Sequence, residues 1–193
     1  MKRHRNLVYY LGLFGLMLAV WLVGVNAAVA QEAGARGYLK CNIHYQQHGH
    51  DAKASYANWT DPGQGHMILP VNTQVGLSTF RGGFSIIALP AKKEILFYFD
   101  EKNMHMTIEQ YQALIISPAP VQLDAFSEQD RKGISEGRAY VGMSKNGVMM
   151  ALGYPAVHRT PSLDANTWVY WKNRFKSFAV EFGDNGLVSS SGQ

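Results

Sequence analysis

Side chains of kinds that bind transition metals follow one another in the pattern C-x2-H-x3-H-x-H: Cys41, His44, His48 and His50. Two further histidines, His66 and His105, could approach them in the fold. Thiolate and imidazole groups at this spacing could hold zinc or copper. We prefer a structural interpretation, because residues 48–51 are typical of a turn and strand alternation puts Cys41 and His44 on opposite faces. We expect no cofactor, with a periplasmic metal-binding protein as the alternative.

The segment GISEG, residues 133–137, matches the G-x-S-x-G pattern of serine hydrolases. A nucleophile elbow requires a strand before the serine, a helix after it, and then an acid and a histidine in that order. Here the pattern predicts a helix before Ser135. His158 is the only later histidine, and no aspartate lies between the two residues. We therefore predict that the protein is not an enzyme.

Aromatic residues alternate along the segment TWVYW, residues 167–171. In a strand, Trp168 and Tyr170 share one face and Trp171 lies on the other. Two predicted helices can cover only one face of a small sheet, so we expect Trp168 and Tyr170 in the core. The other face would then display a tryptophan among cations, which resembles an interface hot spot. The predicted partner-binding residues are Trp171, Lys172, Arg174 and Lys176.

The first thirty residues have the pattern of a secretory signal peptide. Lys2, Arg3 and Arg5 precede an apolar run over residues 7–25, and Ala-Val-Ala precedes Gln31. The run is also long enough for an uncleaved membrane anchor, which stays the alternative. Cys41 lies too far beyond the run to accept a lipid, so we expect no lipoprotein. The predicted location is the periplasm or cell envelope, with membrane contact only through an uncleaved leader.

Composition argues against a nucleic-acid partner. The chain of 193 residues has 18 Lys and Arg against 14 Asp and Glu. Three of the basic residues belong to the leader, so 15 basic and 14 acidic residues remain, a net charge of +1. Most of the chain's excess of basic residues therefore lies in the targeting segment and is no sign of a nucleic-acid partner. A single cysteine excludes an intramolecular disulfide, so packed cores must stabilise the fold.

The pattern changes at Ser-Pro-Ala-Pro, residues 117–120, and we place a domain boundary there. Residues 31–120 predict a small antiparallel barrel or sandwich of five short strands, closed by a helix over 108–115 that Thr107 caps. Residues 121–193 predict an α+β domain: a helix after Ser127, a helix between Ser144 and Gly153, and a three-stranded meander. The predicted fold class is therefore α+β.

The second half resembles the BamE (SmpA/OmlA) family, small envelope proteins associated with the machine that inserts β-barrels into the outer membrane. The resemblance lies in residues 127–190, in four motifs: G-M-S at 142–144, L-G-x-P at 152–155, W-x-Y at 168–170 and F-x-x-x-G-x-V at 182–188. It implies two helices on a three-stranded meander and contact with an envelope or outer-membrane protein. The implied role is accessory to outer-membrane protein assembly or envelope integrity.

Two departures from the family pattern favour the shared fold over membership of the machine. The family has Glu or Gln three residues after the capping serine, where this chain has Gly147, and the capping box is lost. The lipid-accepting cysteine of the machine's members is also missing at its usual place. In the first half, the segment LPVNT at 69–73 is similar to SH3-type modules of envelope proteins.

Overall fold

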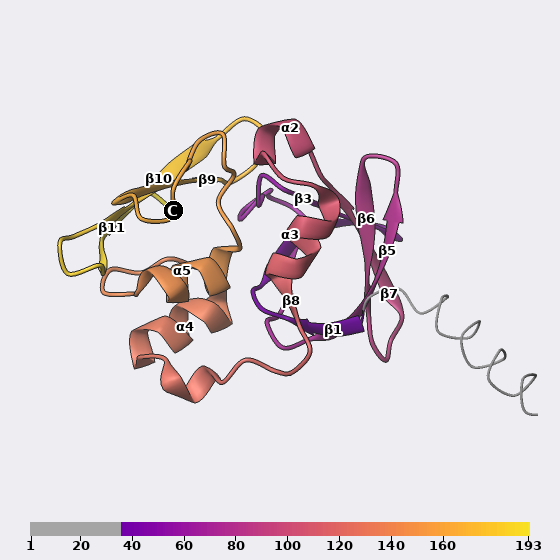
Figure 1. Ribbon diagram of the computed structural model, residues 1–193, viewed down its shortest axis with the longest axis horizontal. Coiled ribbons are helices and arrows are strands. Elements are labelled where there is room, and N and C mark those ends of the chain that lie inside the picture. The colour runs from indigo at the N-terminus through magenta and orange to yellow at the C-terminus, as the bar shows by residue number, and fades with distance from the viewer. Residues whose placement is uncertain (1–35) are drawn as a thin grey trace, which may run out of the picture. The chain divides into compact units, whose positions relative to one another are not determined.

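Two β-sheets organise residues 36–193, which are the part of the chain that this computed structural model describes (Figure 1). The described residues cluster as one compact unit. The predicted leader and its cleavage site at Gln31 lie outside the described residues. Within residues 36–193, the helices are all too short or too polar to cross a bilayer.

The first sheet is a half-barrel of eight strands in the order β4-β2-β3-β7-β6-β5-β1-β8. Its strands are β1 (Arg36–Leu39), β2 (Ile43–His48), β3 (Asp51–Ser55), β4 (His66–Leu69), β5 (Gln74–Phe80), β6 (Gly83–Ala88), β7 (Lys93–Tyr98) and β8 (Ile116–Ser117). Neighbours run antiparallel except β3 and β7, which run parallel. The sheet is therefore mixed, where the sequence predicts an antiparallel one.

Helix α3 (Ile108–Ile115) packs into the curved first sheet and follows the short helix α2 (Glu101–Met104), which the sequence analysis does not predict (Figure 1). Thr107 and Gln110 form the capping box that starts α3, as expected for its N-cap. The ring of Tyr111 lies 5.4 Å from Phe97 and 4.9 Å from Phe99, between centroids. These aromatic rings, tilted against one another, form the centre of the first hydrophobic core.

The second sheet is the predicted meander, in the order β11-β10-β9: β9 (Thr167–Trp171), β10 (Ser177–Phe182) and β11 (Val188–Ser191). Before it come the turn η2 (Leu123–Ala125) and helices α4 (Glu128–Glu136) and α5 (Lys145–Leu152). Trp168 and Tyr170 are buried against β10 and the helices, which confirms the predicted inner face. The chain is therefore α+β, with a half-barrel followed by a meander.

Asp130 of α4 completes the N-terminal cap of α5. Ser144 is the N-cap residue and accepts a hydrogen bond from Gly147 N at 3.0 Å. The buried carboxylate of Asp130 accepts hydrogen bonds from Ser144 N at 2.7 Å and from Ser144 Oγ at 3.1 Å. It therefore replaces the acid that a capping box would place at position 147. Gly147 is required there because a Cβ would lie 2.5 Å from the carboxyl carbon of Asp130.

The free C-terminal carbonyls of α5 are bound by the half-barrel. Asn42 N donates to Met150 O at 2.8 Å, and Asn42 Nδ2 donates to Ala151 O at 3.2 Å. His44 Nε2 also contacts Ala151 O, at 2.9 Å. Asn58 Nδ2 donates to the carbonyl of Leu152, the last helical residue, at 3.0 Å and to that of Tyr154 at 2.8 Å. Three buried polar side chains therefore cap this helix from the other module.

Candidate functional site

The tip of the β9–β10 hairpin, residues 172–176, presents the most exposed large hydrophobic side chain of the described residues. Phe175 is 77% exposed. Asn173 Oδ1 accepts hydrogen bonds from Phe175 N at 3.0 Å and Lys176 N at 3.1 Å, and Lys172 N donates to Lys176 O at 2.8 Å. The turn is therefore held in one conformation with the ring directed outward. We call residues 172–176 the hairpin tip.

Three of the predicted partner-binding residues are cations of the hairpin tip. The guanidinium carbon of Arg174 lies 4.7 Å from the centroid of the Phe175 ring, and Lys172 Nζ lies 5.8 Å from the Phe178 ring. Arg174 and Lys176 are exposed, and Lys172 is half-buried. Within residues 36–193, none of the three is paired with a carboxylate at salt-bridge distance. The tip therefore combines an apolar ring with uncompensated positive charge.

The fourth predicted residue, Trp171, is half-buried, although strand alternation predicts a displayed side chain. Its ring stacks on His158 at 6.5 Å between centroids, and Arg159 lies 5.9 Å from the ring. Its carbonyl accepts a hydrogen bond from Thr60 N at 2.9 Å, and its buried indole Nε1 has no hydrogen-bond partner among residues 36–193. The half-barrel and the segment before β9 thus cover part of this face. A role for Trp171 in partner binding stays a prediction.

The candidate metal ligands are distributed between the core and a turn. Cys41 lies in the first hydrophobic core, and burial raises the pKa of its thiol to about 12. His44 is buried, whereas His48 and His50 are exposed at the end of the β2–β3 hairpin, as the turn pattern predicts. Among residues 36–193, no three His, Cys, Asp or Glu side chains gather closely enough to hold a metal ion.

His44 forms a buried hydrogen-bond chain with His66, which the sequence analysis does not predict. His44 Nδ1 lies 3.0 Å from His66 Nε2, and the rings are stacked 5.2 Å apart. Because the carbonyl of Ala151 can only accept, His44 Nε2 carries the proton and His44 Nδ1 accepts from His66. Burial lowers the pKa of His44 from 6.5 to about 4. Burial also lowers the pKa of His66, and Asp61 opposes that shift.

Ser135, the serine of the G-x-S-x-G match, lies within α4 and is exposed. Its hydroxyl donates to Lys132 O at 2.9 Å, one turn earlier in the same helix. A nucleophile elbow instead places the serine between a strand and a helix. The surroundings of Ser135 therefore give no support to a hydrolase.

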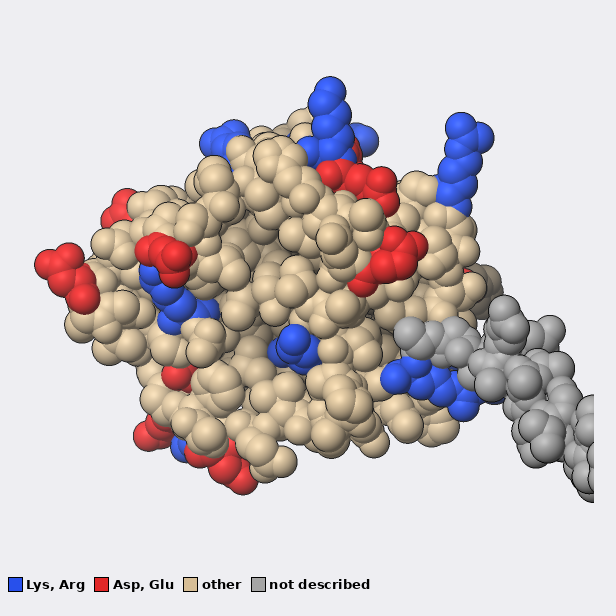
Figure 2. Space-filling model, viewed as in Figure 1, with Lys and Arg blue, Asp and Glu red and all other residues tan. Residues whose placement is uncertain are grey.

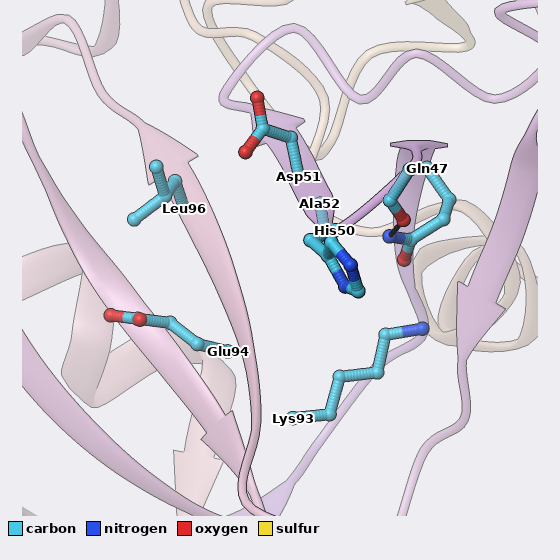
Figure 3. A pocket seen from close by; sticks show the side chains of 8 residues that line it. Gln47, His50, Asp51, Ala52, Lys93, Glu94 and Leu96 are labelled. Atoms are coloured by element: carbon cyan, nitrogen blue, oxygen red, sulfur yellow. Dashed lines mark hydrogen bonds between the residues drawn. The ribbon is translucent and has the colours of Figure 1, made fainter.

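A cavity of about 430 Å³ lies between the β2–β3 hairpin, residues 47–52, and the first residues of β7, 93–96 (Figure 3). The parallel pairing of β3 with β7 starts at Lys53 opposite Leu96. The residues that precede this pair in the two strands diverge, and the cavity lies between them. Its lining is mainly polar and contains Lys93, Glu94 and Asp51. Sequence reasoning missed this site, because its two walls come from segments about forty residues apart that pair only in the fold.

Charge is dispersed over the face of the molecule that Figure 2 shows. Uncharged residues cover most of that face, and the acidic and basic side chains stand mainly at its margins. A surface that binds a nucleic-acid backbone instead gathers Lys and Arg along a stripe or patch.

Comparison with protein-family models, with curated proteins and with solved structures finds no match to this chain.

Proposed function

We propose that this chain is an exported protein that acts by binding another envelope protein, with the hairpin tip as its contact surface. The observation that carries the proposal is the exposure of Phe175 on a hydrogen-bonded turn among cations. Aromatic and Arg side chains are enriched among hot-spot residues. The order of the turn matters too, because a contact that is already in its bound conformation loses less entropy on association.

The partner that fits the hairpin tip has an apolar pocket with acidic residues around it. Arg174 lies over the Phe175 ring, Lys172 and Lys176 belong to the same tip, and none of the three has a carboxylate partner among residues 36–193. Complementary charge would speed association and fix the orientation of the complex. The resemblance of residues 127–190 to the BamE family makes proteins of outer-membrane assembly the first partners to test.

Replacing Phe175 by alanine is expected to weaken partner binding about thirtyfold, a loss of about 2 kcal/mol, because the ring is the apolar anchor. Thermal stability should not change, because the ring is 77% exposed. The measurement has two steps: affinity capture from envelope fractions with wild-type and variant bait, and then titration of the purified partner. Leu163→Ala is the matched control, because Leu163 is also exposed, at 41%, and lies outside the hairpin tip.

Charge provides a second test of the same surface. Arg174→Glu should slow association with the purified partner, and added salt should weaken wild-type binding more than it weakens binding of the variant. Equal binding by wild type and Phe175→Ala would refute the contact surface. Capture of the same proteins by all baits would indicate non-specific adhesion and would also count against the proposal.

A further inference from the structure

A small cavity of about 10 Å³ lies between the half-barrel and the end of helix α5. Strands β2 and β3 pair only over residues 46–48 and 51–53, so the two strands are apart at His44 and Ser55, which both line this cavity. Asn58 and residues of β7, α3 and the end of α5 complete the lining. The volume corresponds to that of a site for one water molecule.

Asn58 presents a buried acceptor at this cavity. Its Nδ2 donates to the carbonyls of Leu152 and Tyr154, at 3.0 and 2.8 Å. Because carbonyls can only accept, these two bonds fix the orientation of the amide and identify Oδ1 as its acceptor. Asn58 is 7% exposed, and Oδ1 has no hydrogen-bond partner among residues 36–193. Buried acceptors are nearly always satisfied in folded proteins, so we expect a donor from outside the chain.

Ser55 provides a donor at the same cavity. Its side chain is buried, and its Oγ accepts a hydrogen bond from Ala57 N at 3.2 Å. The hydroxyl hydrogen has no acceptor among residues 36–193, so it is free to donate. Asn58 N donates to Ser55 O at 2.9 Å, and this turn therefore holds both side chains beside the cavity.

The chemistry of the lining favours a neutral ligand. Among the described residues that line the cavity, none has a carboxylate, ammonium or guanidinium group. The two ring nitrogens of His44 are already engaged by Ala151 O and His66 Nε2. A bound ion would therefore be a buried charge without a counter-charge, which is strongly unfavourable. Water carries no charge and can both donate and accept.

We propose that this cavity binds one structural water molecule that bridges Asn58 and Ser55. The water donates to Asn58 Oδ1 and accepts from Ser55 Oγ. It thereby stabilises the amide orientation in which Asn58 binds the carbonyl of Leu152 at the end of α5. The site is independent of the hairpin tip, so either proposal can fail alone.

The first test uses the wild-type protein and needs no added ligand. A high-resolution crystal structure should show one water within hydrogen-bond distance of both Asn58 Oδ1 and Ser55 Oγ. In solution, nuclear Overhauser cross-peaks should connect water with the side-chain amide hydrogens of Asn58, as for a water that stays bound longer than the protein tumbles. Ordered side chains with no water between these two oxygens would overturn the proposal.

A variant tests the bridge itself. Ser55→Ala removes one of the two partners, so the residence time of the water should fall about tenfold and the cross-peaks to Asn58 should weaken. Ser78→Ala is the matched control, because Ser78 also lies in a strand of the half-barrel but is exposed and outside the cavity lining. Unchanged cross-peaks in Ser55→Ala, or equal losses in both variants, would refute the bridge. If Ser55→Ala fails to fold, the wild-type measurement decides.

Discussion

Replacing Gly147 by alanine is expected to lower the free energy of unfolding by about 3 kcal/mol. The new Cβ would lie 2.5 Å from the carboxyl carbon of Asp130, which is 4% exposed and fixed by Ser127 Oγ and by both donors of Ser144. The carboxylate must move, and it then loses charge-assisted hydrogen bonds in a buried place. This loss outweighs the gain of about 1 kcal/mol that alanine gives a helix over glycine.

The measurement is urea unfolding of single and double variants. Asp130→Ala should destabilise the protein as well, because it leaves Ser144 N without its acceptor. In the Asp130→Ala background, Gly147→Ala should cost much less than in wild type, since the two nearest atoms, Oδ1 and Cγ of Asp130, are gone and only the Cβ at 3.0 Å remains. Gly76→Ala is the control, because an added Cβ at Gly76 meets no atom of the described residues within 4 Å. Additive effects of the two substitutions would contradict the proposed contact.

Acid is expected to destabilise the protein by about 3 kcal/mol between pH 7 and pH 4 through His44 alone. Burial lowers the pKa of His44 from 6.5 to about 4, so the unfolded chain binds this proton more readily than the folded protein. The stability from neutral His44 is therefore fully present above pH 6.5 and is lost as the pH falls toward 4. His66 has its pKa lowered by burial too, which adds to the loss in the same direction.

The variant that isolates this effect is His44→Gln, in which an uncharged amide can still donate to Ala151 O. Unfolding midpoints in urea at pH 7, 6, 5 and 4 should fall less steeply for His44→Gln than for wild type. His66→Gln measures in the same way how much His66, whose ring is partly exposed, contributes to the acid sensitivity. Parallel curves for wild type and His44→Gln would show that carboxylates, and not His44, cause the acid sensitivity.

Much of the secondary structure could be predicted because its causes are local. Thr107, Ser127 and Ser144 each start the helix that follows, and each accepts a hydrogen bond from a backbone amide three residues later. The alternation of Trp168 and Tyr170 also identified the buried face of the meander. Propensity and periodicity operate over a few residues, so a single sequence contains this information.

Features that depend on distant pairing could not be predicted in the same way. The parallel contact of β3 with β7 follows from the order of eight strands, which no local pattern specifies. Gly147 looked like a lost capping residue, because the acid that replaces it belongs to another helix and also serves that helix's own N-cap. The exposure of Phe175 could have been predicted locally, because the sequence places this aromatic residue between Arg174 and Lys176, in the connection between two strands of the predicted meander.

The capping of α5 by the half-barrel has a consequence for the order in which the chain can fold. Asn42, His44 and Asn58 precede the helix whose carbonyls they bind by about a hundred residues. Synthesis proceeds from the N-terminus, so the binding groups exist before the helix emerges from the ribosome. A circular permutant that begins at residue 121 would reverse this order. Helix α5 would then be synthesised first, and its three carbonyls would stay exposed to water until the half-barrel had formed.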